Sequence, residues 1–504
     1  MAKYKRYDYS QKVFIPVSLE DQLMPGTLEF AIHTLIESRM DMSVFDGNFK
    51  NDETGRSAYD PKVLLKIVLL GYSRGLISSR KIERACCENV TFMAMSCNQR
   101  PDHSTIAAFV SSMKGEILPL FRDILLVCEE ENLLGGTFFA LDGCKLSSNA
   151  SKQWSGKFAD IKKKKDKIEK KVKRLLAEQI EADKNDSDDL TELSNREKQV
   201  KKLQKQANRI EKWLKEASPK IGKKGREINS NVTDNDSATL TSIHGTIQGY
   251  NAQALVDSKN QVIVHGEAFG RDDSGLLAPM VKSAKSNMEA AGYGKDYFEG
   301  KTFTTDSNYH NKETLKTCDQ EKLDAYIPDK RFRSRDPNFK DNRKRRAGLV
   351  DRFRLEHFHC NEDNDEYRCP NGKVLTLHVK KTVYDGIVYR GYAANKADCK
   401  GCELKVKCLR RKNAKRKTIF IPIGHVPGNL FKAMQDKIDS DQGRRIYSRR
   451  IAIVEPVFAN IRTHKEMNRL TLRGKIKVNI QWMLYCMVHN IGKIVRCGLN
   501  YGFT

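Results

Sequence analysis

The sequence contains no long hydrophobic run, and it has few acidic residues relative to its basic ones. None of its apolar stretches approaches the length of a membrane-spanning helix, which argues against an integral membrane protein. The first residues, MAKYKRYDYSQK, are basic but lack the hydrophobic segment of a secretory signal. We therefore expect a cytoplasmic protein in which most of the 13 cysteines are reduced core thiols.

The shortage of acids leaves a large positive charge. Lys and Arg number 90 against 64 Asp and Glu, a formal net charge of +26. Such an excess indicates a polyanionic partner, and nucleic acid is the first candidate; the alternative is a basic protein without such a partner. With 504 residues, 39% of them hydrophobic, the chain can bury substantial cores, and we expect about two to four domains.

Three acidic residues stand out because their neighbours are apolar or typical of strands. Asp142 ends the apolar run 138–141, Asp306 ends the strand-like segment 301–305, and Glu455 lies in a helical segment that contains several arginines. A buried carboxylate is costly unless it is paired or binds a metal ion. In so basic a chain, the three acids predict a carboxylate site for two divalent ions, Mg²⁺ or Mn²⁺, that acts on phosphodiesters.

Each acid also has an ordinary structural interpretation. Asp142 could be a turn residue at the end of a strand, and Asp306 could cap a helix. Glu455 could form an ion pair with Arg449 or Arg450.

Several sequence blocks occur in an order that resembles the DDE transposases of bacterial insertion sequences. They are LDGCKLSSNAS at 141–151, GYNAQALVD at 249–257, TTDSNYHNKETL at 304–315, CPNGKVL at 369–375, CKGCELKVKC at 399–408, YSRRIAIVEPVFANI at 447–461 and HNIGK at 489–493. The nearest branch is the one named for insertion sequence eleven-eighty-two, within the group that shares the insertion-sequence-five type of N-terminal domain. The resemblance covers nearly the whole chain.

The resemblance implies roles for individual residues. Asp142, Asp306 and Glu455 would be the catalytic, metal-binding triad. The family places a tyrosine and a basic residue before its glutamate and a lysine after it, and here Tyr447, Arg450 and Arg462 match in kind as DNA-binding groups. The spacing from Arg450 to Glu455 is one residue longer than usual, and Arg462 stands where lysine is common, so Lys465 is a second candidate.

The pattern of apolar residues predicts an α/β protein, and the resemblance refines this to an RNase-H-like core, a mixed sheet flanked by helices. The expected parts are an all-α, helix-turn-helix-like DNA-binding domain (1–135), the core (136–150 and 226–330), an antiparallel helical hairpin with coiled-coil packing (151–225), a basic and Cys-rich insertion (331–420) and the C-terminal helices that carry Glu455 (421–504). From the pattern alone, the first part could equally be a helical bundle used for dimerisation.

Some local expectations can be compared directly with the structure. We expect a helix at 272–289 capped by Asp272 or Asp273, and two long helices at 430–468 and 471–496, the first kinked by Pro456. The arginine-rich segment 331–354 suits contacts with a nucleic-acid backbone, or is a disordered basic loop. The lysines of the hairpin are interpreted as a solvated helix face.

Four cysteines are clustered in the Cys-rich insertion. Cys369 lies in a turn, Cys399 and Cys402 form a CxxC pair, and Cys408 follows closely. Four thiolates on tight turns suit a structural zinc ion, so we expect one Zn²⁺ there, with Cys360 as a spare ligand. The alternative is a group of reduced cysteines without metal.

Together these features predict a transposase. It would bind the terminal inverted repeats of its element, cut the ends by metal-dependent hydrolysis, and join the 3′-hydroxyl ends to target DNA. Because two ends must be brought together, we expect a homodimer or larger assembly on DNA, within the bacterial nucleoid. The alternatives are a catalytically decayed DNA-binding repressor and a metal-dependent endonuclease without strand transfer.

Overall fold

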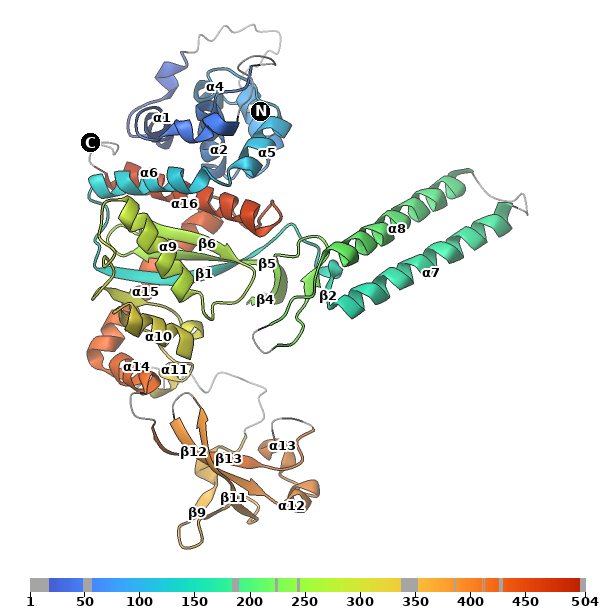
Figure 1. Ribbon diagram of the computed structural model, residues 1–504, viewed down its shortest axis with the longest axis vertical. Coiled ribbons are helices and arrows are strands. Elements are labelled where there is room, and N and C mark those ends of the chain that lie inside the picture. The colour runs from blue at the N-terminus through green and yellow to red at the C-terminus, as the bar shows by residue number, and fades with distance from the viewer. Residues whose placement is uncertain are drawn as a thin grey trace, which may run out of the picture.

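The computed structural model describes residues 18–48, 57–183, 190–222, 225–242, 245–336, 352–384, 387–409, 411, 413–425 and 429–498. Figure 1 shows a central sheet with helices above and below it, a pair of long helices that projects to one side, and a small separate sheet at the lower end. The predicted mixed α/β architecture is confirmed. Among the described residues, no helix combines the length and apolar character needed to cross a membrane.

The N-terminal region is helical. Its helices are α1 (Leu28–Ser38), α2 (Pro61–Ser73), α3 (Ser79–Glu88), α4 (Val90–Met95), α5 (His103–Ser112) and α6 (Ile117–Glu130). Polar side chains start several of them: the Asp60 carboxylate accepts a hydrogen bond from the Lys62 amide (2.7 Å), as the Asp-Pro start of α2 predicts. Thr27 caps α1 in the same way through the amide of Phe30 (3.3 Å).

The central sheet has six strands. They are β1 (Phe138–Ser147), β4 (Ala238–Ser242), β5 (Gly245–Asp257), β6 (Ile263–Phe269), β7 (Thr302–Thr304) and β8 (Asp324–Tyr326). Their order is β4-β5-β1-β7-β8, and β6 also pairs with β5. β5 runs antiparallel to β1, β4 and β6, whereas β1, β7 and β8 are parallel to one another. Asp142 lies in the middle of β1, and Asp306 follows the parallel strand β7 by two residues.

Helices cover this sheet and join it to the N-terminal region. They are α9 (Leu277–Ala290), α10 (Lys312–Gln320), α14 (Leu430–Asp439), α15 (Asp441–Ala459) and α16 (Lys475–Cys497). α15 packs against β1 and β5, and α9 packs against β5 and β6. α16 contacts β6 as well as α1, α2, α5 and α6, so one continuous hydrophobic core includes both the N-terminal helices and the sheet (Figure 1).

Two helix predictions were wrong in detail. The expected helix 430–468 is divided at Ser440, whose hydroxyl accepts a hydrogen bond from the Gly443 amide (3.0 Å) and so starts α15 anew. α15 continues through Pro456 and ends in a π turn, Asn460–His464. Neither Asp272 nor Asp273 caps α9, which begins at Leu277 without a side-chain cap.

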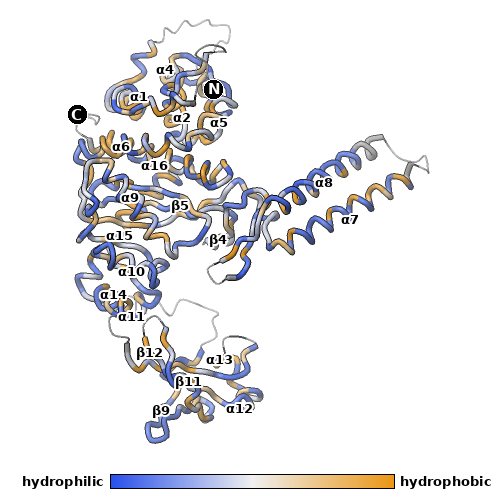
Figure 2. The backbone as a smooth tube through the Cα atoms, in the orientation of Figure 1, coloured by the Kyte–Doolittle hydropathy of each residue, from blue (hydrophilic) through white to orange (hydrophobic). Residues whose placement is uncertain are grey.

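A pair of helices, α7 (Phe158–Asp183) and α8 (Leu190–Glu216), follows β1 and precedes β4. Two short strands, β2 (Ser155–Gly156) and β3 (Ser230–Asn231), close its base. There Phe158 packs on Trp213 with ring centroids 4.8 Å apart. The rest of the pair is largely hydrophilic in Figure 2. Most of the expected turn between the helices, residues 184–189, lies outside the described residues.

The Cys-rich region forms an antiparallel sheet that the sequence did not predict. Its elements are α11 (Phe332–Arg335), β9 (His359–Asn361), β10 (Glu366–Arg368), β11 (Val374–Tyr384), β12 (Ile387–Ala394), α12 (Lys396–Lys400), α13 (Lys405–Cys408) and β13 (Thr418–His425), and the strand order is β13-β12-β11-β10-β9. A small core of its own holds this sheet together, centred on Phe358 and Leu375. Residues 337–351 of the arginine-rich segment lie outside the described residues.

Candidate active site

Asp142 on β1 lies near Asp306, which follows the neighbouring parallel strand β7 by two residues. The last pair of the two strands is Ala140 with Thr304, and each acid comes two residues after its member of that pair. Neighbouring strands are about 4.8 Å apart, which keeps the two carboxylates near each other. The sheet thus brings together two acids that are 164 residues apart in the sequence.

The Asp142 carboxylate is held from two sides. Its Oδ1 accepts a hydrogen bond from the Gly143 amide (2.7 Å), and its Oδ2 accepts one from Nη1 of Arg450 on α15 (2.6 Å). Burial raises the pKa of Asp142, the Arg450 charge opposes this rise, and the nearby Asp273 adds to it. Arg450 is itself only 9% exposed, so each group is the main counter-charge of the other.

Asp306 starts the short helical turn Ser307–Tyr309. Its Oδ1 accepts a hydrogen bond from the Asn308 amide (2.9 Å), and its Oδ2 accepts one from the Asn308 side chain (3.0 Å). The pKa of Asp306 is raised to about 6, first by burial and then by the negative charge of Asp142. Asp306 therefore caps this turn, as one interpretation of the sequence predicted. The same carboxylate also lies close to Asp142.

A third acid, Asp273, is connected to this pair, and the sequence did not reveal it. It follows β6, is buried, and accepts hydrogen bonds from the side chains of Asn251 (2.7 Å), Gln253 (3.1 Å) and Asn308 (3.2 Å). Since Asn308 also donates to Asp306, Asp273 fixes the orientation of the amide that holds the candidate catalytic acid. A usable signal was present: Asn251 and Gln253 are two polar residues on one face of β5, in its apolar stretch from Tyr250 to Val256.

Position 143 has no room for a side chain, so glycine is required there. It lies opposite Gln253 in the sheet, and a side chain at this position would collide with the amide groups of Gln253 and Asn251. A larger residue next to Asp142 would therefore disrupt the amides that bind Asp273.

Glu455 is on α15 and is exposed. Glu455 and Asp142 both lie near Cys144, which follows Asp142 by two residues on the same face of β1. Burial raises the pKa of Cys144 to about 11, Arg462 lowers it, and Asp142 and Glu455 raise it further. Among the described residues, however, no three His, Cys, Asp or Glu side chains are grouped so that they could hold one metal ion.

The predicted DNA-binding side chains separate into two places. Tyr447 lies beside Arg450, whose guanidinium carbon is 6.0 Å from its ring centroid, and Arg462 lies beside Cys144; these three surround the acid pair. Lys465 instead lines a cavity formed with α1 and α16.

Four of the five clustered cysteines are neighbours. Cys369, Cys399 and Cys402 all raise the pKa of Cys408, after burial as the first cause and against the lowering effect of Lys417. Cys360 stands apart on β9, where it interacts with Tyr367. The four thiols predicted as zinc ligands therefore lie in one neighbourhood, although no three of these described side chains are placed to ligate one ion.

Two family models match the chain. A transposase DDE domain matches residues 368–495, and a transposase domain known as DUF772 matches residues 17–112. These matches support a DDE transposase of an insertion sequence. The DDE segment includes Glu455, whereas Asp142 and Asp306 lie outside both matches. No curated protein matches the chain.

Transposases of the DDE type use divalent metal ions, usually Mg²⁺. Asp142 and Asp306 fit such an ion, because both are oxygen ligands and lie close enough that the negative charge of Asp142 adds to burial in raising the pKa of Asp306. In the present arrangement Glu455 is not grouped with them, and Arg450 provides the positive charge next to Asp142.

Proposed function

We propose that this chain is a transposase that cleaves DNA at the ends of its element and joins the freed 3′-hydroxyl groups to target DNA. Its catalytic groups would be Asp142, Asp306 and Glu455. The observation that carries the proposal is the nearness of Asp142 on β1 to Asp306, which follows the adjacent parallel strand β7. The strand order, an antiparallel unit of β6, β5 and β1 extended by the parallel strands β7 and β8, supports an RNase-H-like core.

Each side chain around the acids has its own proposed role. Asp142 and Asp306 would hold Mg²⁺ or Mn²⁺, with Glu455 as a further ligand; two such ions, when bound, supply an activated water and stabilise the leaving oxygen. Arg450 orients Asp142 and offers a buried positive charge to the phosphate that is cut. Asn308, oriented by Asp273, holds Asp306 in place.

Recognition of the terminal inverted repeats would fall to the N-terminal helices. α3 presents the exposed side chains of Arg80, Lys81 and Arg84, which suit contacts with DNA phosphates. Tyr447, Arg462 and the acid pair would contact the end that is cut. Two such chains, one for each end, form the expected homodimer on DNA.

The test uses DNA fragments that carry the sequences flanking this reading frame, end-labelled and incubated with the full chain and Mg²⁺. We expect wild type to nick and to join, whereas Asp142→Asn, Asp306→Asn and Glu455→Gln bind the fragment but do not cut it. Asp319→Asn, at an exposed position on α10, is the matched control and should cut normally.

The other outcomes identify the alternatives. A wild-type protein that binds and never cuts with any divalent ion is a repressor, and one that cuts without joining is an endonuclease. If only Glu455→Gln remains active, the pair Asp142 and Asp306 stands and the third acid is another residue.

We also propose that Cys369, Cys399, Cys402 and Cys408 bind one structural zinc ion. Their mutual effect on the Cys408 thiol supports this, because a cation would offset the repulsion between thiolates. Metal analysis of the purified chain should find one zinc that Cys402→Ser removes and Cys360→Ser leaves in place. Equal zinc content in both variants would reject this ligand set.

A further inference from the structure

A cavity of about 470 Å³ lies where the start of α1 meets the π turn after α15 and the end of α16. Three of its lining side chains are basic: Lys465, Lys493 and Arg496. No acidic residue is among those that line it. A concave surface with only positive charges favours an anion.

Lys465 is the most unusual of these side chains. It is only 8% exposed, and within the described part of the chain its ammonium group has no ion pair or hydrogen bond. The π turn Asn460–His464 brings it inward, and the Lys465 amide donates to the carbonyl of Asn460 (3.0 Å). Burial of an ammonium group without a counter-charge is costly, so the arrangement lacks a negative partner.

The other groups in the cavity do not supply that partner. Lys493 donates to the neutral side chain of Gln261 (2.8 Å). His489 lies between Gln261 and Asn460, and burial lowers its pKa to about 3, so its ring is neutral. The pKa of Lys465 is lowered to about 8, by burial first and then by Arg496 and Lys493.

The start of α1 adds a further favourable feature. Gly26, Thr27 and Leu28 line the cavity, and α1 is eleven residues long, so the positive end of its dipole lies at this space. The acid of its first turn, Glu29, is paired with Arg74 (3.1 Å). The buried lysine and the helix start come from opposite ends of the chain, so they are independent observations.

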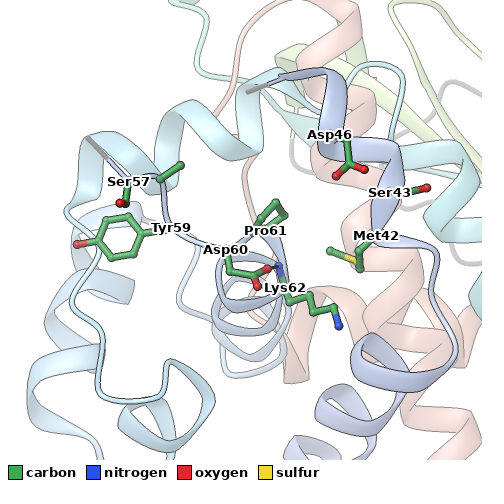
Figure 3. Close-up of a pocket in the computed structure, with 9 residues that line it drawn as sticks. Met42, Ser43, Asp46, Ser57, Tyr59, Asp60, Pro61 and Lys62 are labelled. Atoms are coloured by element: carbon green, nitrogen blue, oxygen red, sulfur yellow. Dashed lines mark hydrogen bonds between the residues drawn. The ribbon is translucent and has the colours of Figure 1, made fainter. Parts of the chain in front are cut away.

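A second cavity, of about 570 Å³, shows what a less suitable surface looks like (Figure 3). Asp46 and Asp60 line it, and the one lysine there, Lys62, pairs with Glu37 (2.9 Å). Because its lysine already has an acidic partner and two aspartates line it, this cavity does not call for an anion.

We propose that the cavity around Lys465 binds a phosphate group, supplied either by the DNA backbone or as a free phosphate. Lys465 and Lys493 donate to the phosphate oxygens, Arg496 stands at the rim, and the amides at the start of α1 face the same oxygens. The site is separate from the acid pair, and its existence does not depend on the proposed cleavage reaction. It would also connect the N-terminal helices to the C-terminal helices through one ligand.

Titration of the full chain with inorganic phosphate, by calorimetry in chloride buffer at constant ionic strength, tests the site directly. We expect one saturable site in wild type, at least tenfold weaker binding in Lys465→Met and in Lys493→Gln, and no change in Lys295→Met, an exposed lysine far from the cavity. Absence of saturable binding in wild type, or equal binding in all four proteins, would overturn the proposal.

A second arm distinguishes the two sources of phosphate. If DNA supplies the group, Lys465→Met weakens binding of a short duplex more than Lys295→Met does, and inorganic phosphate competes with the duplex. If the ligand is free phosphate, duplex affinity stays equal while phosphate binding is lost. Asp142→Asn must bind phosphate like wild type, so failure of the cleavage proposal would not be mistaken for failure of this one.

Discussion

The acid pair and the Lys465 cavity both bury charged groups, but the acids have hydrogen-bonding or charged partners, whereas the Lys465 ammonium group has none within the described residues. Asp142 has Arg450 as a counter-charge and Asp306 has the amides of Asn308, whereas Lys465 has no acidic partner among the described residues. In both places the pKa moves toward the neutral form, to about 6 for Asp306 and about 8 for Lys465. Hydrogen bonds alone thus do not compensate for burial, and each place favours a ligand of opposite charge.

Removal of Arg450 should have the largest effect on stability. Arg450→Met leaves the Asp142 carboxylate buried without a counter-charge, which we expect to cost about 3–5 kcal/mol of unfolding free energy at pH 7. Urea unfolding measures this. The loss should shrink as the pH is lowered, because the raised pKa of Asp142 favours its protonation. Arg445→Met, at an exposed position on the same helix, should cost almost nothing.

The role of Asp273 can be separated from that of the catalytic acids. Asp273→Asn places an amide N–H against the donating side chain of Asn308, so the hold on Asp306 loosens. We expect DNA cleavage about 10–100-fold slower with unchanged DNA affinity. Asp273 also raises the pKa of Asp306, so the pH profile of cleavage should move to lower pH. An unchanged profile would assign Asp273 a purely structural role.

Lys465, which has no acidic partner among the described residues, should destabilise the fold when no anion is bound. Lys465→Met should raise the free energy of unfolding by about 1–3 kcal/mol at pH 7. Because the folded pKa of Lys465 is lowered to about 8, from 10.5 in the unfolded chain, the penalty is full below pH 8 and fades as pH rises toward 10.5. Unfolding curves at pH 7 and pH 10 measure the difference, and a variant less stable than wild type would contradict it.

Asp306 should have a smaller effect on the free energy of unfolding, and its destabilising effect should grow, rather than fade, as the pH rises. Its folded pKa of about 6 lies above the usual 3.8, so ionisation destabilises the fold as pH rises from 4 to 7. Wild type should lose about 1–2 kcal/mol across this range relative to Asp306→Asn. Mg²⁺ should abolish the loss in wild type if the acid pair holds the ion, and it should leave Asp306→Asn unchanged.

The sequence located the acids but not their relation. An apolar run before Asp142 and a strand-like segment before Asp306 predict two strand ends. This was wrong for Asp142, because β1 continues to Ser147, and Asp306 follows the end of β7 by two residues. Their nearness depends on strand register, which a local pattern does not contain. Asp273 was missed because two successive aspartates before a helical pattern look like a cap, and its real partners come from β5 and from Asn308.

Other differences also have local physical causes. Ser440 divides a continuous amphipathic pattern because its hydroxyl starts a new helix. The small sheet was missed because many side chains of β11 face solvent, which leaves no clear alternation to read. Lys465 was predicted beside the catalytic helix from its spacing, but the π turn before it directs it into a different cavity.

The position of α16 has a consequence for the order of events during synthesis. The N-terminal helices pack against α16, which ends at Cys497, and they share one hydrophobic core with the sheet. The ribosome must therefore have made the chain as far as α16 before these helices can complete their packing. Until then those helices are only partly packed and expose apolar surface. Nascent chains cut short before α16 should consequently need chaperones or be degraded.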